Sequence, residues 1–271
     1  MSQERFHLIK TFDDRTGAHL VIRISLQAMD LHDGTDCTEK EAQQIYNTAH
    51  NVMRKVHDCW DKLEEYRQKE SELMVPPKRL PSGPNTEAIA YQASIELVNL
   101  LENFLYQAKS SLDVAVKYLR VLLGKKRIAA HTYSKEGQAV IKELERKTPT
   151  KLKRRADLLI QFMRDNEPWI KELVDLRDKA SHFLKDFEGF GDFIVATTDT
   201  GQIRPMHSPE KTYLQYMEET WRRLLLFHED FVALAINLRV LEGVHVFAPE
   251  SRGQYDRKWF LRFEPASAGI A

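Results

Sequence analysis

The chain has 271 residues, of which 42% are hydrophobic and 30% charged, a composition typical of a globular protein with a sizeable core. Forty acidic side chains balance forty basic ones, so net charge supplies no overall attraction to nucleic acid or an anionic membrane. Two cysteines, Cys37 and Cys59, are too few for a disulfide framework. No apolar run approaches the roughly 18 residues of a bilayer span, and no signal-peptide core occurs, so we expect a cytoplasmic protein without a membrane segment.

The first elements are predicted from β-forming residues and a helix start. Residues rich in β propensity flank a turn signal, and they predict a β-hairpin over 5–26, followed by a loop over 27–36. Thr38 and Glu41 have the spacing of a capping box, in which each side chain bonds a backbone amide of the first turn. An apolar stripe at four- and three-residue spacing then predicts a long helix over 38–73.

The middle of the chain predicts further helices. A proline-rich linker over 76–84 precedes the longest one, which begins near residue 85 and stops at Gly124. Its broad apolar face indicates a central helix with several neighbours. A short charged helix is expected over 134–146.

Two more helices are expected before the C-terminal third of the chain. One covers about 150–166. A separate helix is expected to start at Glu167-Pro168-Trp169, because proline is tolerated in a first turn.

The last third of the chain predicts a hairpin over 193–208 and a final long helix that opens at Ser208-Pro209-Glu210 and runs to about Leu241. A tail over 244–265 has two strand-like pieces, which we expect to pair with the N-terminal hairpin.

The predicted fold class is therefore mainly α. We expect a single domain over 1–271, built as an antiparallel bundle of four to five long helices with a small β-sheet or hairpin at the N- and C-terminal ends. Residues 85–241 form the bundle proper, and the 193–208 hairpin is an insertion in it.

One hexapeptide carries the functional argument: Arg177-Asp178-Lys179-Ala180-Ser181-His182. Cleavage of a phosphodiester needs a cation for the phosphate and an imidazole that moves a proton near neutral pH. On a helix, Asp178 and His182 share a face at i and i+4, whereas Arg177 and His182 lie roughly 140° apart. That separation favours a composite site with residues from two chains.

The order of an arginine, a polar residue, three further residues and a histidine resembles the motif of the HEPN family, helical bundles that include many metal-independent RNases. The resemblance implies a homodimer in which two motif helices face each other, and attack of a ribose 2′-hydroxyl that leaves a 2′,3′-cyclic phosphate. It implies that His182 acts as general base or acid, that Arg177 stabilises the phosphorane charge and that Asp178 orients, with no metal and no cofactor. Such an endoribonuclease would be a toxin or defence effector with an antitoxin or other partner protein.

Two alternatives to catalysis stay open. Elements outside a minimal HEPN bundle, and inactive members of the family, favour a noncatalytic dimerisation or RNA- or nucleotide-binding module, or an interaction scaffold. Arg223 and His228 repeat the spacing of the motif, but Leu224 breaks its polar position. The place of His228 on an apolar stripe predicts a hydrogen-bonded core histidine.

A basic cluster predicts contacts with RNA. It includes Lys151, Lys153, Arg154 and Arg155, and a second cluster follows the longest helix at Lys125, Lys126 and Arg127. Positive charge in a first helical turn opposes the macrodipole, which indicates an external anion such as phosphate. The alternative is a solvated charged face. Tyr118 and Tyr133 are candidates for stacking on bases.

The sequence gives little support for a metal site, because the dipeptide His57-Asp58 lacks further ligands.

Overall fold

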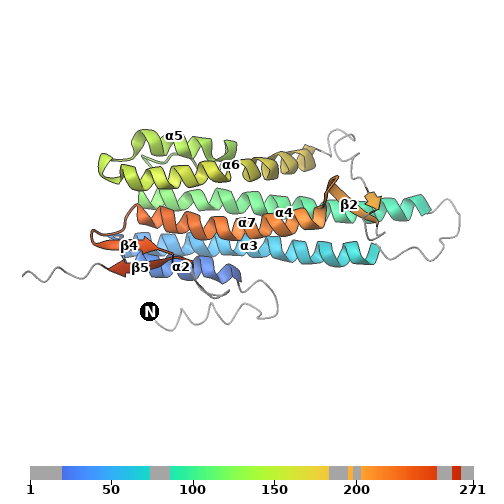
Figure 1. Cartoon of the computed structure of the whole chain (residues 1–271), viewed down its shortest axis with the longest axis horizontal. Helices are drawn as coiled ribbons and strands as arrows, with labels where there is room; N and C mark the ends of the chain where they lie inside the picture. The colour runs from blue at the N-terminus through green and yellow to red at the C-terminus, as the bar shows by residue number, and fades with distance from the viewer. Residues whose placement is uncertain (1–19, 74–85, 183–194, 198–202, 249–257, 264–271) are drawn as a thin grey trace, which may run out of the picture. The chain divides into compact units, whose positions relative to one another are not determined.

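The structure is a computed structural model that describes residues 20–73, 86–182, 195–197, 203–248 and 258–263. Six α-helices account for most of this part of the chain, and the mainly α fold class is therefore confirmed (Figure 1). The helices are α2 (Ile22–His32), α3 (Glu39–Leu73), α4 (Thr86–Leu122), α5 (Gln138–Lys147), α6 (Lys153–His182) and α7 (Tyr213–Asn237). The strands are β1 (Val195–Thr197), β2 (Ile203–Ser208), β3 (Lys211–Thr212), β4 (Val244–Phe247) and β5 (Phe260–Phe263).

The chain divides into two compact units. Unit 1 comprises the described residues within 1–57, 110–170 and 224–271, and unit 2 those within 58–109 and 171–223. The four long helices α3, α4, α6 and α7 each contribute residues to both units. The single-domain organisation stays a prediction.

Helix α2 corrects the predicted hairpin over 5–26 and the loop over 27–36. The first strand of the predicted hairpin lies outside the described residues. Helix α2 occupies the place of the second predicted strand and of most of the predicted loop. Val21, Ile24, Ala28 and Leu31 repeat at three- and four-residue spacing, and all four are fully buried. The β-branched residues favoured a strand locally, but burial of this helical stripe outweighs that propensity.

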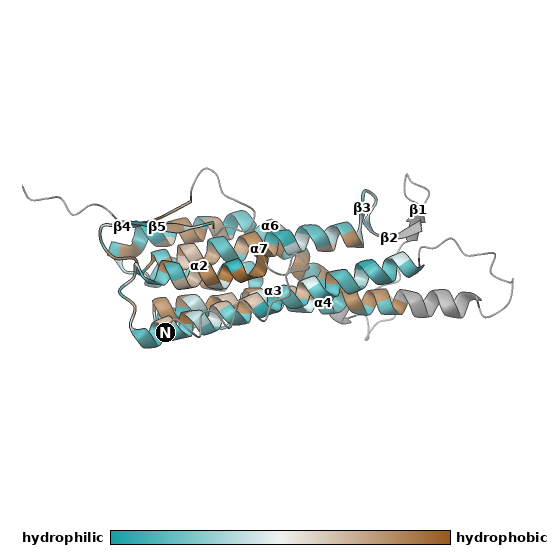
Figure 2. Ribbon diagram, turned by 90° about the horizontal axis from the view of Figure 1, so that it is seen from below, coloured by the Kyte–Doolittle hydropathy of each residue, from teal (hydrophilic) through white to brown (hydrophobic). Residues whose placement is uncertain are grey.

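Helices α3 and α4 confirm the predictions for 38–73 and for the longest helix. The capping box is present, because the Thr38 amide donates to Glu41 Oε2 at 2.9 Å and the Glu41 amide donates to Thr38 Oγ1 at 3.3 Å. Figure 2 shows hydrophobic and hydrophilic residues alternating along both helices, as expected for helices with one apolar and one polar face. In the described part of the chain, none of the helices combines the length and the apolar run that crossing a bilayer requires.

Helix α6 corrects the prediction of two helices separated at Glu167. It is one continuous helix, and Pro168 lies inside it rather than in a first turn. Proline lacks the N–H that an interior helical position normally donates. Two side-chain hydrogen bonds lie next to Pro168. Asn166 Nδ2 donates to the Phe162 carbonyl at 2.9 Å, and Trp169 Nε1 donates to Asn166 Oδ1 at 2.7 Å.

The strands form two small antiparallel sheets. β1 and β2 pair with Ala196 opposite Arg204, which confirms the 193–208 hairpin, and β3 extends this sheet. Because β3 and a Thr212–Gln215 capping box follow, α7 begins at Tyr213 rather than at Ser208. The two tail pieces pair with each other as β4 and β5, not with an N-terminal hairpin, and this pair lies beside α2 (Figure 1).

Phe227 of α7 is the centre of an aromatic cluster in the core of unit 1. Its ring stacks on Phe162 of α6, with ring centroids 5.2 Å apart, and on Phe231 one helical turn further along α7. The rings of Tyr133 and Trp169 pack edge to face against Phe227, and the centroid of each lies 5.9 Å from the Phe227 centroid. Such pairs contribute about 0.5–1.5 kcal/mol each beyond the apolar area they bury. The cluster therefore fixes α6, α7 and the segment before α5 against one another.

A buried polar connection joins α2 to α7 in unit 1. Arg23 pairs with Glu229 in a bidentate way, because its Nε donates to Oε1 at 2.8 Å and its Nη2 donates to Oε2. Glu229 is fully buried and Arg23 is 5% exposed, so solvent screens this pair poorly. Gln27 extends the connection, because it donates to the Glu229 carbonyl and accepts from the Trp259 amide.

We predict that Glu229→Ala lowers the free energy of unfolding by about 3–5 kcal/mol, because it leaves the buried Arg23 guanidinium without its carboxylate. Urea unfolding followed by circular dichroism measures the loss. Glu218→Ala is the control on the same helix, since Glu218 pairs with Arg67 at a position where both side chains are more than a third exposed, and such pairs contribute less than about 1 kcal/mol. Equal losses in both variants would contradict the assignment.

Candidate functional site

The predicted motif lies on the last turns of α6, within unit 2. Arg177 Nη1 donates to Asp178 Oδ1 at 2.6 Å, and the Arg177 guanidinium lies over the ring of Tyr106, 5.4 Å from its centroid. His182 belongs to the helix, but its side chain lies outside the described part of the structure. The predicted contact of His182 with Asp178 therefore stays a prediction.

The pairing of Arg177 with its neighbour has a chemical consequence. Asp178 partly neutralises the guanidinium, so a phosphate has to compete with this carboxylate for Arg177. Asp175, an acid one turn earlier on the same helix, pairs with Lys171 at 2.6 Å. Stacking on an aromatic ring leaves the edges of a guanidinium open in general, but the Nε atom of Arg177 is buried.

His228 is the core histidine that the sequence predicted. It is 1% exposed, and its Nε2 lies 2.9 Å from Ser111 Oγ. In the described part of the chain, its Nδ1 has no hydrogen-bond partner. Burial lowers the pKa of His228 to about 3, so the imidazole is neutral at pH 7. It is therefore unsuited to be a second proton donor of a cleavage site.

A cationic surface is present in unit 1. It is made by two stretches, 123–127 and 146–155, which together hold nine basic residues and no acidic one: Lys125, Lys126, Arg127, Arg146, Lys147, Lys151, Lys153, Arg154 and Arg155. Glu143 connects the two stretches, because it accepts from the amides of Ala129 and Ala130 and from Lys147. The end of α5 and the start of α6 lie side by side there (Figure 1).

The four residues predicted to bind RNA are not equivalent on this surface. Lys151 and Arg154 are exposed, and no described carboxylate lies within ion-pair distance of either. Lys153 pairs with Asp157 at 3.1 Å, while Arg155 donates to the Val240 carbonyl at 2.7 Å and ties the start of α6 to the segment after α7. Lys151 and Arg154 are therefore the ones most available to an anion.

The stacking role suggested for Tyr118 and Tyr133 is wrong. Tyr118 is 1% exposed and Tyr133 fully buried, so neither ring can reach a base. Tyr133 packs on Phe227 and lies under Gly137, where an added Cβ would come within 2.6 Å of its ring. Both tyrosines belong to the core, and the cationic surface lacks these two stacking platforms.

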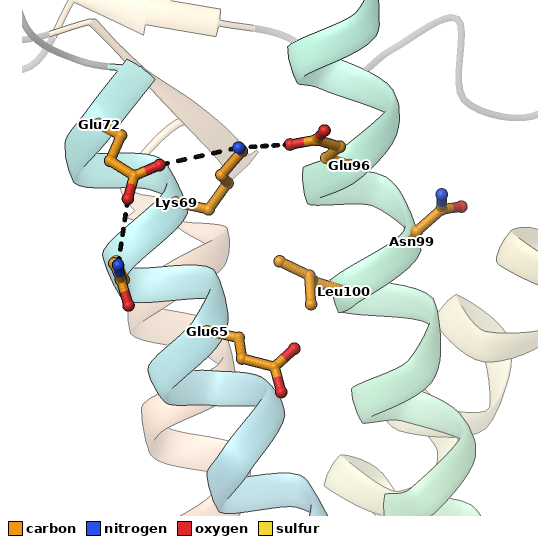
Figure 3. A pocket seen from close by; sticks show the side chains of 7 residues that line it. Glu65, Lys69, Glu72, Glu96, Asn99 and Leu100 are labelled. Atoms are coloured by element: carbon orange, nitrogen blue, oxygen red, sulfur yellow. Dashed lines mark hydrogen bonds and ion pairs between the residues drawn. The ribbon is translucent and has the colours of Figure 1, made fainter.

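An open pocket of about 450 Å³ lies in unit 2 between α3 and α4, lined by Glu65, Gln68, Lys69, Glu72, Glu96, Asn99 and Leu100. Figure 3 shows Lys69 reaching from α3 to Glu96 on α4, where its Nζ lies 2.6 Å from the carboxylate. The hydrogen bond with Glu96 raises the pKa of Lys69. Three carboxylates against one ammonium make this pocket repel phosphate.

Sequence reasoning missed His207, a histidine with a carboxylate partner from a distant part of the chain. His207 of β2 lies with Nε2 2.9 Å from Glu172 Oε1 of α6, and its ring packs on Tyr216, with centroids 4.3 Å apart. The partners are 35 residues apart in the chain, and no local spacing links them.

Among the described residues, one group on α3 could hold a metal ion. His57, Asp58 and Asp61 each offer a ligand atom, and these atoms lie within 4.8 Å of one another. The sequence had shown only the His57-Asp58 dipeptide, but Asp61 follows one helical turn after His57. Three ligands leave a tetrahedral zinc site one short, and exposed carboxylates commonly gather without an ion.

Comparison with protein-family models, with curated proteins and with solved structures gave no match for this chain.

We predict a pH dependence of stability that originates at His228. Its pKa is about 3 in the folded state and 6.5 in the unfolded state, so below pH 6.5 the unfolded chain binds a proton that the folded chain does not. The free energy of unfolding should then fall by about 1.4 kcal/mol per pH unit as the pH drops from 6.5 toward 3. Urea unfolding of wild type and His228→Gln between pH 4 and 7 measures the difference. Parallel curves would contradict the assignment.

Proposed function

We propose that this protein binds RNA through the cationic surface of unit 1. The observation that supports the proposal is the run of nine basic residues without an acid over 123–127 and 146–155, in a chain whose total charge is zero. Lys153, Arg154 and Arg155 lie in the first turn of α6, where the helix macrodipole is also positive, and Lys151 lies in the 3-10 turn directly before it. A phosphate backbone relieves this local accumulation of positive charge.

The chemistry of the surface indicates which part of RNA it recognises. Lysine and arginine contact phosphates, which are the same in every sequence. Tyr118 and Tyr133 are buried, so they add no stacking on unpaired bases. We therefore expect binding with weak sequence preference and strong dependence on salt.

The test is fluorescence anisotropy with a labelled single-stranded RNA at several salt concentrations. The double variant Lys151→Glu/Arg154→Glu should weaken binding, because both side chains are exposed and have no described carboxylate partner. Loss of two phosphate contacts should also lower the magnitude of the salt slope by about 1.4, given roughly 0.7 per contact on a single strand.

The matched control is Lys62→Glu/Lys171→Glu, which changes the net charge of the chain by the same amount in unit 2. Both lysines are partly exposed and pair with nearby acids, Lys62 with Glu65 and Lys171 with Asp175. RNA binding that fell equally in both double variants would show a general charge effect and contradict the proposed surface.

Cleavage of RNA at Arg177, Asp178 and His182 is a second candidate function. It rests on the resemblance to HEPN nucleases and on Arg177, whose side chain is 29% exposed and would exchange Asp178 for a phosphate. In this proposal a homodimer brings together the motifs of two chains, Arg177 stabilises the phosphorane and His182 moves the proton. An antitoxin or another partner protein belongs to the same proposal.

We predict that wild type cleaves single-stranded RNA in EDTA and leaves 2′,3′-cyclic phosphate ends, whereas Arg177→Ala and His182→Ala do not. Gel analysis with end-group chemistry measures both properties. Arg164→Ala is the control on the same helix, because Arg164 is exposed and pairs with Glu145 at 2.6 Å. Two results would rule out this site: RNA that stays intact with the wild type, or cleavage that survives in both motif variants. Neither result would contradict the proposed RNA binding at unit 1.

A further inference from the structure

The loop after α4 has a fixed conformation. Gly124 has φ of +86°, a left-handed conformation that ends the helix, and its carbonyl accepts from the amides of Arg127 and Ile128 at 3.0 and 3.1 Å. Ile128 is fully buried and anchors the loop in the core. Lys125, Lys126 and Arg127 are exposed on the outside of this turn.

Glu143 of α5 holds the far side of the loop. Its Oε2 accepts from the amides of Ala129 and Ala130 at 3.0 and 2.9 Å, and its Oε1 accepts from Lys147 at 2.9 Å. The side chain is 15% exposed. Burial acts to raise the pKa of Glu143, but the bonds from Ala130, Lys147 and Ala129 outweigh it and hold the pKa below its usual value. The carboxylate is therefore ionised in its three-bonded position at neutral pH.

Electrostatics alone makes Glu143 unfavourable for RNA binding. It is a negative charge within a cationic surface, and it uses one of the nine cations, Lys147, as its partner. A residue that only added charge would reduce affinity for a phosphate backbone. Its bonds to two consecutive backbone amides have a different effect, because they restrain the loop that carries three other cations.

We propose that Glu143 is a positioning residue for RNA binding, whose carboxylate fixes the 124–130 loop so that Lys125, Lys126 and Arg127 bind phosphates together with Lys151 and Arg154. The inference rests on the proposed RNA binding. A preorganised loop binds more tightly because the entropy of ordering its backbone is lost on folding rather than on binding.

The experiment compares Glu143→Ala, Glu143→Gln and Glu145→Ala in the anisotropy assay. All three remove one negative charge from α5, so electrostatics alone predicts equal or tighter binding for each. Glutamine keeps a carbonyl oxygen that can accept from Ala129 and Ala130, whereas alanine removes the acceptor. Both changes at position 143 release Lys147, so their difference isolates the loop.

We expect Glu143→Ala to bind RNA about tenfold more weakly than wild type at 0.1 M salt, with a salt slope smaller by up to about 2, as three lost contacts on a single strand imply. Glu143→Gln and Glu145→Ala should bind as tightly as wild type or more tightly. Binding by Glu143→Ala that is as tight as that by Glu145→Ala would overturn the proposal.

A measurement without RNA separates this inference from the proposed function. Hydrogen exchange at the amides of Ala129 and Ala130 should be faster in Glu143→Ala than in wild type and should stay slow in Glu143→Gln. If the wild type fails to bind RNA while these rates change as expected, the loop restraint holds and the RNA function is wrong. Slow exchange retained in Glu143→Ala would overturn the restraint itself.

Discussion

Neutralisation of charge within the helices decides which cations remain for a partner. Along the exposed helix faces, acids stand three or four residues from many bases, as at Lys62 and Glu65 or Lys171 and Asp175. The stretches 123–127 and 146–155 contain no acid, and among the described residues the carboxylates that pair with their cations are Glu143 of α5 and Asp157 of α6. A chain with zero net charge thereby acquires a local surface with strong attraction for polyanions.

The packing of unit 1 holds this surface in place. Phe227 fixes α6 and α7 through the rings of Phe162 and Trp169, and Tyr133 attaches the segment before α5 to the same cluster. Arg155 then ties the first turn of α6 to the Val240 carbonyl. These contacts use aromatic rings and one cation for structure, so Tyr133 and Arg155 are less available to a nucleic acid than the sequence alone suggests.

Local signals in the sequence predicted most of the fold, and both long-range packing and local side-chain bonds account for the errors. The Thr38–Glu41 capping box and the stop at Gly124 depend on neighbours within four residues, so both are visible in the sequence. The prediction for residues 20–32 was wrong because β propensity competes with a buried helical stripe, and because α2 is also held by a distant residue through the Arg23–Glu229 pair. Pro168 was misplaced because Asn166 and Trp169 stabilise the helix around it. The His207–Glu172 pair has no local signal in the sequence. For Arg177 and Asp178, the sequence shows that they are neighbours but not that their side chains pair.

The measurement that tests the account most directly is lysine footprinting of the wild-type protein with and without single-stranded RNA, analysed by mass spectrometry. Bound phosphates shield ammonium groups from acylation. The account predicts that RNA lowers the modification of Lys125, Lys126 and Lys151 on unit 1 and leaves Lys62 and Lys171 on unit 2 unchanged. Protection confined to Lys62 or Lys171, or no protection at any of these lysines, would contradict it.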